Sequence, residues 1–143
     1  MCSCTRRALL GAIAGLATGL LGRRHAFAAP HERHRAFIDS AFAMKAEAER
    51  AGDQSFGAVV VRGGDIVGRG PSRVIVKRDW TAHAEREAIR DAQARLRTAD
   101  LTGCVIYSTS RPCSNCERAA AEAKIERMFF GADAIDAGRP KPL

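Results

Sequence analysis

Two short segments, TAHAERE at 81–87 and PCSNC at 112–116, most constrain what this chain can fold into. Each stands at the predicted start of a helix, where free backbone N–H groups and the positive end of the helix dipole favour thiolates. Cys113 and Cys116 are at i and i+3, so both sulfurs lie on one face of the helix. A fold that joins the two helix starts would gather nitrogen and sulfur donors in one place.

The pattern around these segments predicts an α/β domain. Helical spacing of apolar residues extends over 32–50, and SFGAVVVR, a Gly-Gly-Asp turn and IVGRG together predict a β-hairpin. The next helix has Thr81 as a plausible N-cap, and a third strand, GCVIYSTS, follows it. Pro112 opens a further helix, and IERMFFGA forms a fourth strand.

The predicted order is α-β-β-α-β-α-β, a three-layer α-β-α sandwich around a mixed sheet in which each crossover helix connects neighbouring strands. Residues 71–79 are predicted to form a loop. The final segment, GADAIDAGRPKPL, is predicted to supply at most a short turn.

Residues 1–28 are predicted to be an export signal rather than part of the fold. Arg6 and Arg7 precede an apolar run at 8–22, and AFA before Ala29 is a small-x-small cleavage site. An arginine pair just ahead of the apolar run is typical of a twin-arginine signal; an uncleaved anchor and an ordinary secretory signal are the alternatives. The run is shorter than the roughly 20 residues of a comfortable membrane span. We therefore expect a periplasmic or exported protein without a stable span after cleavage.

Cleavage would change the charge and the cysteine content of the remaining domain, residues 29–143. The full chain has a formal net charge of +7, but 1–28 holds four arginines and no acidic residue, which leaves +3. This balance gives little support for a nucleic-acid partner. Of five cysteines, Cys104, Cys113 and Cys116 remain. An odd number does not suit a disulfide scaffold.

The close cysteine pair indicates a zinc site that is completed by the other helix. Zinc prefers thiolate and imidazole ligands in a tetrahedron, and His83 is the obvious third ligand. Three protein ligands leave one position open, which is the pattern of catalytic rather than structural sites. Cys104 at the start of a strand, and His31 and His34 near the start of the domain, are not well placed to close the site.

Glu85 stands beside this predicted site without being a ligand. It follows His83 by two positions, and side chains at i and i+2 point apart on a helix. It can still reach a water held in the open position. Zinc lowers the pKa of such a water to about 7, and a neighbouring carboxylate can take its proton and pass it on.

HAE at 83–85 with PCSNC at 112–116 matches the H-x-E…P-C-x-x-C signature of zinc nucleobase deaminases. The wider stretches SFGAVVVRGGDIVGRGPSRV, RDWTAHAEREAIRDA and LTGCVIYSTSRPCSNC are similar to the same proteins. Residues 32–131 thus resemble the cytidine deaminase-like superfamily, nearest the branch of guanine, cytosine and tRNA adenosine deaminases. A lone C-x-x-C would be a weak signal, whereas the two-part signature in this order is specific.

The resemblance implies a zinc-dependent hydrolase in which His83, Cys113 and Cys116 hold the ion and Glu85 shuttles protons. A zinc-bound hydroxide would attack the amidine carbon of a small nucleobase, nucleoside or related aminated heterocycle, and ammonia would leave. Dimerisation is common among relatives, so a homodimer is a possible assembly. The substrate-binding positions that we single out are Phe56, Ser72, Trp80 and Ala84.

Three positions depart from the family pattern and leave the substrate open. Ser72 replaces an Asn that holds the base in relatives, Arg111 replaces a Glu, and Asn115 replaces a Met. Relatives also continue into a further helix or strand, so we expect an open pocket or one covered by a partner subunit.

Three competing interpretations remain. They are a tRNA-type adenosine deaminase, a C-x-x-C thiol–disulfide protein, and a deaminase fold kept only for binding. The net charge and the export signal disfavour the first. His83 and Glu85 argue against the other two.

Overall fold

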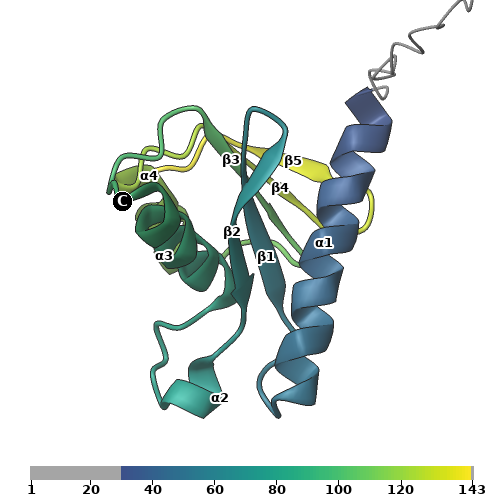
Figure 1. Ribbon diagram of the computed structural model, residues 1–143, viewed down its shortest axis with the longest axis vertical. Helices are drawn as coiled ribbons and strands as arrows, with labels where there is room; N and C mark the ends of the chain where they lie inside the picture. Colours follow the sequence, from purple (N-terminus) through teal and green to yellow (C-terminus); the bar gives the residue numbers. More distant parts are fainter. Residues whose placement is uncertain (1–29, 143) are drawn as a thin grey trace, which may run out of the picture.

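The computed structural model describes residues 30–142, which form a mixed five-stranded sheet packed between helices (Figure 1). The predicted export signal at 1–28 lies outside this range. Within it, no helix is both long and apolar enough to cross a membrane. The strands are β1 (Gly57–Arg62), β2 (Asp65–Pro71), β3 (Cys104–Ser108), β4 (Arg127–Phe130) and β5 (Ile135–Gly138). The helices are α1 (Pro30–Arg50), α2 (Val74–Lys77), α3 (Ala84–Leu96) and α4 (Ser114–Glu122).

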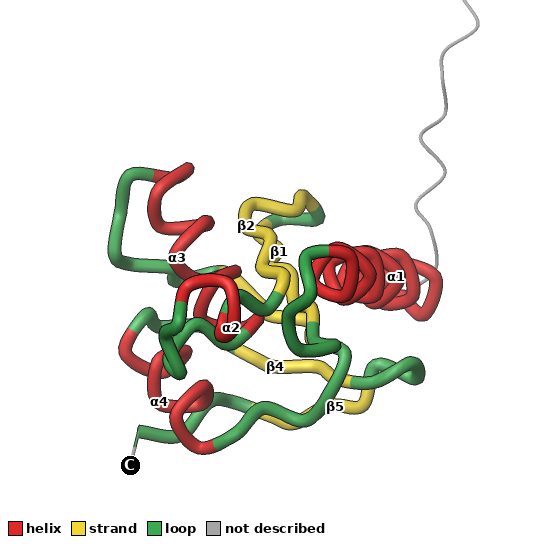
Figure 2. Tube along the Cα trace, turned by 90° about the horizontal axis from the view of Figure 1, so that it is seen from below, coloured by secondary structure: helices red, strands yellow, loops and turns green. Residues whose placement is uncertain are grey.

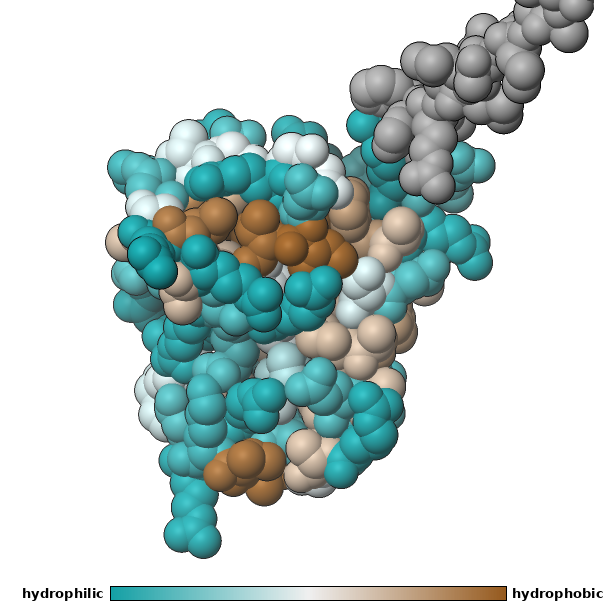
Figure 3. Space-filling view, in the orientation of Figure 1, coloured by the Kyte–Doolittle hydropathy of each residue, from teal (hydrophilic) through white to brown (hydrophobic). Residues whose placement is uncertain are grey.

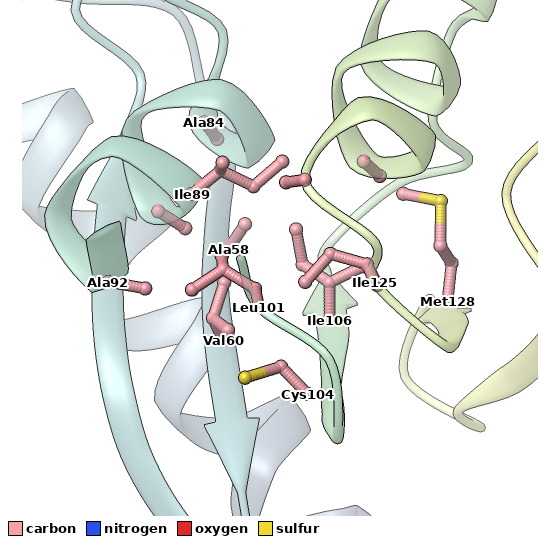
Figure 4. Packing of buried hydrophobic residues seen from close by; sticks show 13 residues of the cluster. Ala58, Val60, Ala84, Ile89, Ala92, Leu101, Cys104, Ile106, Ile125 and Met128 are labelled. Atoms are coloured by element: carbon pink, nitrogen blue, oxygen red, sulfur yellow. The ribbon is translucent and has the colours of Figure 1, made fainter. Parts of the chain in front are cut away.

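The sheet separates two apolar clusters. Helix α1 covers one face of the sheet, and α3 and α4 cover the other (Figure 2). Alternating side chains of β1 face the two layers, because successive residues of a strand point to opposite sides. Ala58 and Val60 pack with α3 and α4, and their neighbours in the core appear in Figure 4. Val59 and Val61 pack with Ile38 of α1. The predicted three-layer α/β fold is confirmed.

One feature of the chain path differs from the prediction. The strand order is β2-β1-β3-β4-β5, so α4 joins the neighbours β3 and β4 but α3 joins two strands that lie on either side of β1. Because β1 is antiparallel to both β2 and β3, those two strands run in the same direction. Their carboxyl ends therefore meet at one edge of the sheet, and α3 and α4 both begin there.

Two short elements are present where the sequence predicted a loop and a turn. The helix α2 lies within 71–79, and its first N–H groups are held by Asp53, whose Oδ2 accepts hydrogen bonds from Ile75 at 2.9 Å and Val76 at 2.8 Å. Its side chains Ile75 and Val76 are 57% and 52% exposed. Figure 3 shows an apolar patch at the lower end of the molecule, where α2 lies in Figure 1. The strand β5 pairs antiparallel with β4 at the sheet edge.

The packing of α3 on the edge strand β2 leaves no room for side chains at two glycines. A Cβ on Gly70 would lie 2.1 Å from the carbonyl oxygen of Ala84 and 2.3 Å from the nitrogen of Ala88. A Cβ on Gly68 would lie 2.3 Å from the carbonyl oxygen of Ala88. These contacts are with helix backbone, which cannot rotate away as a side chain can. The G-x-G spacing thus fixes how closely α3 sits against the sheet.

We expect Gly70→Ala to lower the free energy of unfolding by about 3 kcal/mol, because overpacking at a rigid contact forces the backbone to shift. The midpoint of denaturant unfolding measures this. Gly63→Asn is the matched control, since Gly63 has φ 58° and a Cβ added there would meet nothing within 4 Å. Asn tolerates that conformation, so the control should stay within about 1 kcal/mol of wild type. Equal midpoints for Gly70→Ala and wild type would contradict the packing account.

Candidate metal centre and active site

The side chains of the predicted zinc site stand at the first residues of α3 and α4. His83 and Cys113 are the N-cap residues of these helices, both in extended conformation, and neither side chain caps its own helix. Cys116 lies in the first turn of α4. The helices thus begin two residues later than the predicted starts at Thr81 and Pro112. Thr81 instead belongs to a turn in which its N–H donates to Asp79 Oδ1 at 2.8 Å.

The three donor atoms are spaced as ligands of one ion. Nδ1 of His83 is 3.7 Å from Sγ of Cys113 and 3.5 Å from Sγ of Cys116. A tetrahedral zinc ion, with bonds of about 2.3 Å to sulfur and about 2.0 Å to nitrogen, holds such a pair about 3.5 Å apart. Among residues 30–142 this is the one group of His, Cys, Asp or Glu side chains close enough to share a metal ion. The donor set and its spacing therefore fit zinc.

The other histidines and the third cysteine of the domain lie elsewhere. Cys104 is fully buried in the core between β3 and α3 (Figure 4). Nδ1 of His34 is hydrogen-bonded to the Tyr107 hydroxyl at 2.9 Å. His31 lines a separate cavity beside the turn that joins β4 and β5. None of the three is part of the metal-ligating group, which leaves three protein donors.

Glu85 contacts this group and is buried, with only 6% of its surface exposed. Sγ of Cys116 donates a hydrogen bond to its Oε2 at 3.4 Å. Burial raises the pKa of Glu85 above its ordinary value, although its own backbone N–H, the Cys116 hydrogen bond and His83 oppose the shift. Burial, followed by the Glu85 charge, also raises the pKa of the Cys116 thiol. A nearby cation would favour the ionised forms of Glu85 and Cys116, which again fits a metal site.

A cavity of about 150 Å³ opens beside the metal-ligating group. This volume is small compared with the ~300–1,000 Å³ of sites for drug-sized ligands, so a small occupant fits it best. Two of the four predicted substrate-binding residues, Phe56 and Ala84, line it, and the structure adds three lining residues that we had not predicted as binding positions. The full lining is Gln54, Phe56, His83, Ala84, Glu85, Ser110, Arg111 and Cys113.

The other two predicted substrate-binding residues, Ser72 and Trp80, do not line the cavity. Ser72 is buried, and its hydroxyl donates to Oδ1 of Asp53 at 2.9 Å, so its hydrogen-bonding capacity is directed into the protein. Trp80 is 68% exposed and neither walls the cavity nor belongs to the two core clusters. Ser72 was singled out by its position in the family pattern and Trp80 by its place just before the metal-bearing helix, whereas side-chain direction depends on contacts with distant residues.

Asp53, which the sequence did not single out, organises the segment before α3. Burial alone would raise its pKa, but hydrogen bonds from Val76, Gln54, Ser72 and Ile75 together hold the pKa below its ordinary value. Its carboxylate thus ties the end of β2 and the start of α2 to the segment that carries Gln54. The signal available in the sequence was a single acidic residue between a helix and a strand, which is also typical of a solvated turn.

Glu87, a buried carboxylate near the start of α3, links that helix to α2. Glu87 is 8% exposed and accepts hydrogen bonds from Lys77 at 2.5 Å and from Arg90 at 2.6 Å. Charged hydrogen bonds of this kind are stronger than neutral ones, and here both partners are half-exposed. The start of α3 is therefore fixed against α2 on one side and against Gly70 on the other.

Comparison with known proteins agrees with the zinc-ligand geometry described above. Residues 31–132 match the family described as the cytidine and deoxycytidylate deaminase zinc-binding region. The guanine deaminase of Bacillus subtilis is 36% identical over 105 residues, which are 73% of this chain and 67% of that protein. The tRNA-specific adenosine deaminase of Aquifex aeolicus is 40% identical over 89 residues, 60% of this chain and 59% of the relative.

The fold agrees with the sequence comparison. An X-ray structure of the Bacillus subtilis guanine deaminase superposes with a TM-score of 0.66 at 36% identity, and the match covers 69% of this chain and 64% of that one. This chain therefore matches less than two thirds of that structure and of the Aquifex relative. The match includes both halves of the two-part signature, which confirms the predicted resemblance and zinc as the cofactor. The chain belongs to the cytidine and deoxycytidylate deaminase zinc-binding family.

Proposed function

We propose that the protein is a hydrolytic deaminase of a small nucleobase, nucleoside or related aminated heterocycle, with zinc held by His83, Cys113 and Cys116. The observation that carries this proposal is the spacing of 3.5 and 3.7 Å between the imidazole nitrogen and the two sulfurs at the wall of a small cavity. The same cavity is lined by Glu85, a buried carboxyl group that is not needed as a ligand. A C-x-x-C redox protein has no use for this carboxyl group or for the cavity.

In this proposal the chain's own side chains bind the ring and move the protons. Zinc in a three-ligand site lowers the pKa of a coordinated water to about 7 and so supplies a nucleophile at neutral pH. Glu85 accepts one proton of the attacking water and gives it to the ring nitrogen of the amidine as the C–O bond forms. It then accepts the second proton, from the hydroxyl group now on that carbon, and gives it to the amine, which leaves as ammonia when the C–N bond breaks. Its burial supports this role, because a raised pKa lets a carboxyl group hold a proton closer to neutral pH.

The remaining lining residues would hold the heterocycle in place. Phe56 offers a ring that is 44% exposed, and Ala84 leaves space beside the metal-ligating group. Gln54 and Ser110 supply an amide and a hydroxyl that can bond to ring nitrogens and exocyclic groups. The Ser72 hydroxyl is bonded to Asp53, so we assign hydrogen bonding to the edge of the base to the side-chain amide of Gln54. The backbone N–H of Gln54 donates to Asp53 at 2.8 Å.

Purines are the first substrates to test, because the relatives named above are a guanine deaminase and a tRNA-specific adenosine deaminase. A tRNA substrate is the second candidate, because tRNA-specific adenosine deaminases such as that of Aquifex aeolicus are also similar to this chain. The modest positive charge left after residue 28 favours a small molecule over a polyanion.

An ammonia-release assay of the zinc-loaded full-length protein tests the proposal. The panel contains guanine, adenine, cytosine, their nucleosides, pterin and a tRNA transcript. We expect at least one small heterocycle to release ammonia with zinc bound at one ion per chain. Turnover of the tRNA transcript alone would replace the small-molecule assignment with the second candidate. Absence of ammonia release from every member, with zinc fully bound, would contradict the proposed deaminase.

A further inference from the structure

Arg111 is a cationic side chain at the wall of the cavity, in the segment between β3 and α4. It follows Ser110, whose carbonyl oxygen accepts a hydrogen bond from the Ser108 hydroxyl at 2.7 Å. The carbonyl of Ser108 in turn accepts the N–H of Gly131 at 3.0 Å, just after β4. These bonds attach the backbone before Arg111 to two strands of the sheet. The base of its side chain is therefore held in place relative to the metal-ligating group.

The guanidinium group of Arg111 lies over an aromatic ring and has no polar partner. Its Cζ is 5.9 Å from the centroid of the Phe130 ring. Within residues 30–142 it makes no hydrogen bond and no ion pair, whereas Arg90 and Arg127 pair with Glu87 and Asp136. A guanidinium group that lies over a ring keeps the N–H donors at its edge available. Arg111 thus offers unused donors at the cavity.

The charges around the cavity make the position of Arg111 favourable for an anionic group. Arg111 is the only Lys or Arg among the eight lining residues, and Glu85 is the only carboxylate. A guanidinium group binds carboxylates and phosphates through two parallel hydrogen bonds, which is stronger and more directional than a neutral contact. Burial of a ligand beside it reduces the screening by water. A ligand with an anionic group at this side of the cavity would satisfy the free donors.

We infer that Arg111 binds an anionic substituent, a carboxylate or a phosphate, on the heterocycle that the protein deaminates. This inference rests on the proposed function and narrows its substrate class from neutral bases to anionic derivatives. Gln54 and Glu85 contact the heterocycle, and Arg111 contacts its substituent. The alternative role for Arg111 is that of a solvated surface side chain, which would not distinguish charged from neutral substrates.

Matched substrate pairs test the inference on the zinc-loaded full-length protein. Pterin and pterin-6-carboxylate form the carboxylate arm, and cytidine and cytidine 5′-monophosphate form the phosphate arm. We expect kcat/KM to be about 10- to 100-fold higher for the anionic member of at least one pair. In Arg111→Gln this ratio should fall to near one. Arg111→Lys should keep part of it, because an ammonium group retains the charge but cannot bond in the two-pronged manner.

Arg118 provides the matched control. It lies on α4, donates to Asn115 Oδ1 at 2.8 Å and does not line the cavity. Arg118→Gln removes the same charge from the neighbouring helix, outside the cavity, and should leave the ratio unchanged. A wild-type ratio near one in both arms, or a ratio that survives in Arg111→Gln, would overturn the inference. An equal loss in Arg118→Gln would also overturn it, because the effect would then be one of general charge.

A binding measurement separates failure of the inference from failure of the proposed function. The dissociation constants of both pairs are measured by calorimetry on Glu85→Gln and on the double variant Glu85→Gln/Arg111→Gln, so that turnover does not interfere. We expect the anionic members to bind more tightly to the first protein only. If no substrate releases ammonia in wild type but this difference is present, the deaminase proposal fails and the anion site remains. If the difference is absent, the anion site fails.

Discussion

Replacement of Glu85 by glutamine is expected to reduce ammonia release by about 10²- to 10⁴-fold, the range that general acid–base groups contribute. The amide has nearly the same shape as the carboxyl group and fits the same buried position, but it can neither accept nor return a proton. Zinc content should remain at one ion per chain, since Glu85 is not among the three donors at ligand spacing. The measurement combines steady-state ammonia release with metal analysis of the same preparation.

Glu117→Gln is the control for this substitution. Glu117 lies in the first turn of α4, and its side chain does not line the cavity. It therefore tests whether loss of a negative charge near the site is itself enough to slow the reaction. Ammonia release within about twofold of wild type in Glu85→Gln would disprove the proton-shuttle role, and loss of zinc in that variant would show that Glu85 acts on the ion instead.

Cys113→Ala is expected to abolish zinc binding at stoichiometric metal and to bring ammonia release down to the background rate. Cys113 is exposed, so its removal deletes a ligand with little loss of packing, whereas Cys116 is buried and its replacement would also disturb the core. Two remaining ligands bind zinc far more weakly than three. Because bound metal stabilises only the folded chain, addition of zinc should raise the melting temperature of wild type but not of Cys113→Ala.

Cys104→Ala distinguishes loss of a ligand from loss of a cysteine. Cys104 is fully buried in the core and lies outside the metal-ligating group. We expect this variant to melt at a lower temperature because of the cavity it creates, yet to bind one zinc ion and to release ammonia. Full zinc binding by Cys113→Ala, or loss of zinc in Cys104→Ala, would contradict the assignment of the ligands.

The sequence predicted those parts of the molecule whose signals are local. The hairpin of β1 and β2 follows from two apolar strands around a glycine turn. The zinc ligands follow from the residue types in the two short motifs HAE and PCSNC. The path of α3 across β1 was predicted wrongly, because periodicity shows that a strand exists but not which strand it pairs with. The helix α2 was missed because its order depends on the Asp53 carboxylate, 22 positions before Ile75.

The lining of the cavity was predicted only in part, for a related reason. Phe56 and Ala84 are next to strand or helix ends, so their position follows from the chain path. Ser72 was assigned to the substrate because relatives carry an amide there, but its hydroxyl is taken by Asp53, and neither residue alone predicts that bond. The role proposed for Arg111 depends on its position over Phe130 and on its having no ion pair within residues 30–142, which only the folded chain reveals.

The central place of β1 has a consequence for the order of events during folding. The two halves of the metal-ligating group meet only when β1 has acquired both neighbours, and its pairing with β3 joins residues as far apart as Ala58 and Ser108. Contacts between such distant positions are slow to form, since long loops must close first. We therefore expect zinc to meet all three donors in place only late in folding. Its main kinetic effect would be to slow unfolding, while the folding rate would be set by the chain alone.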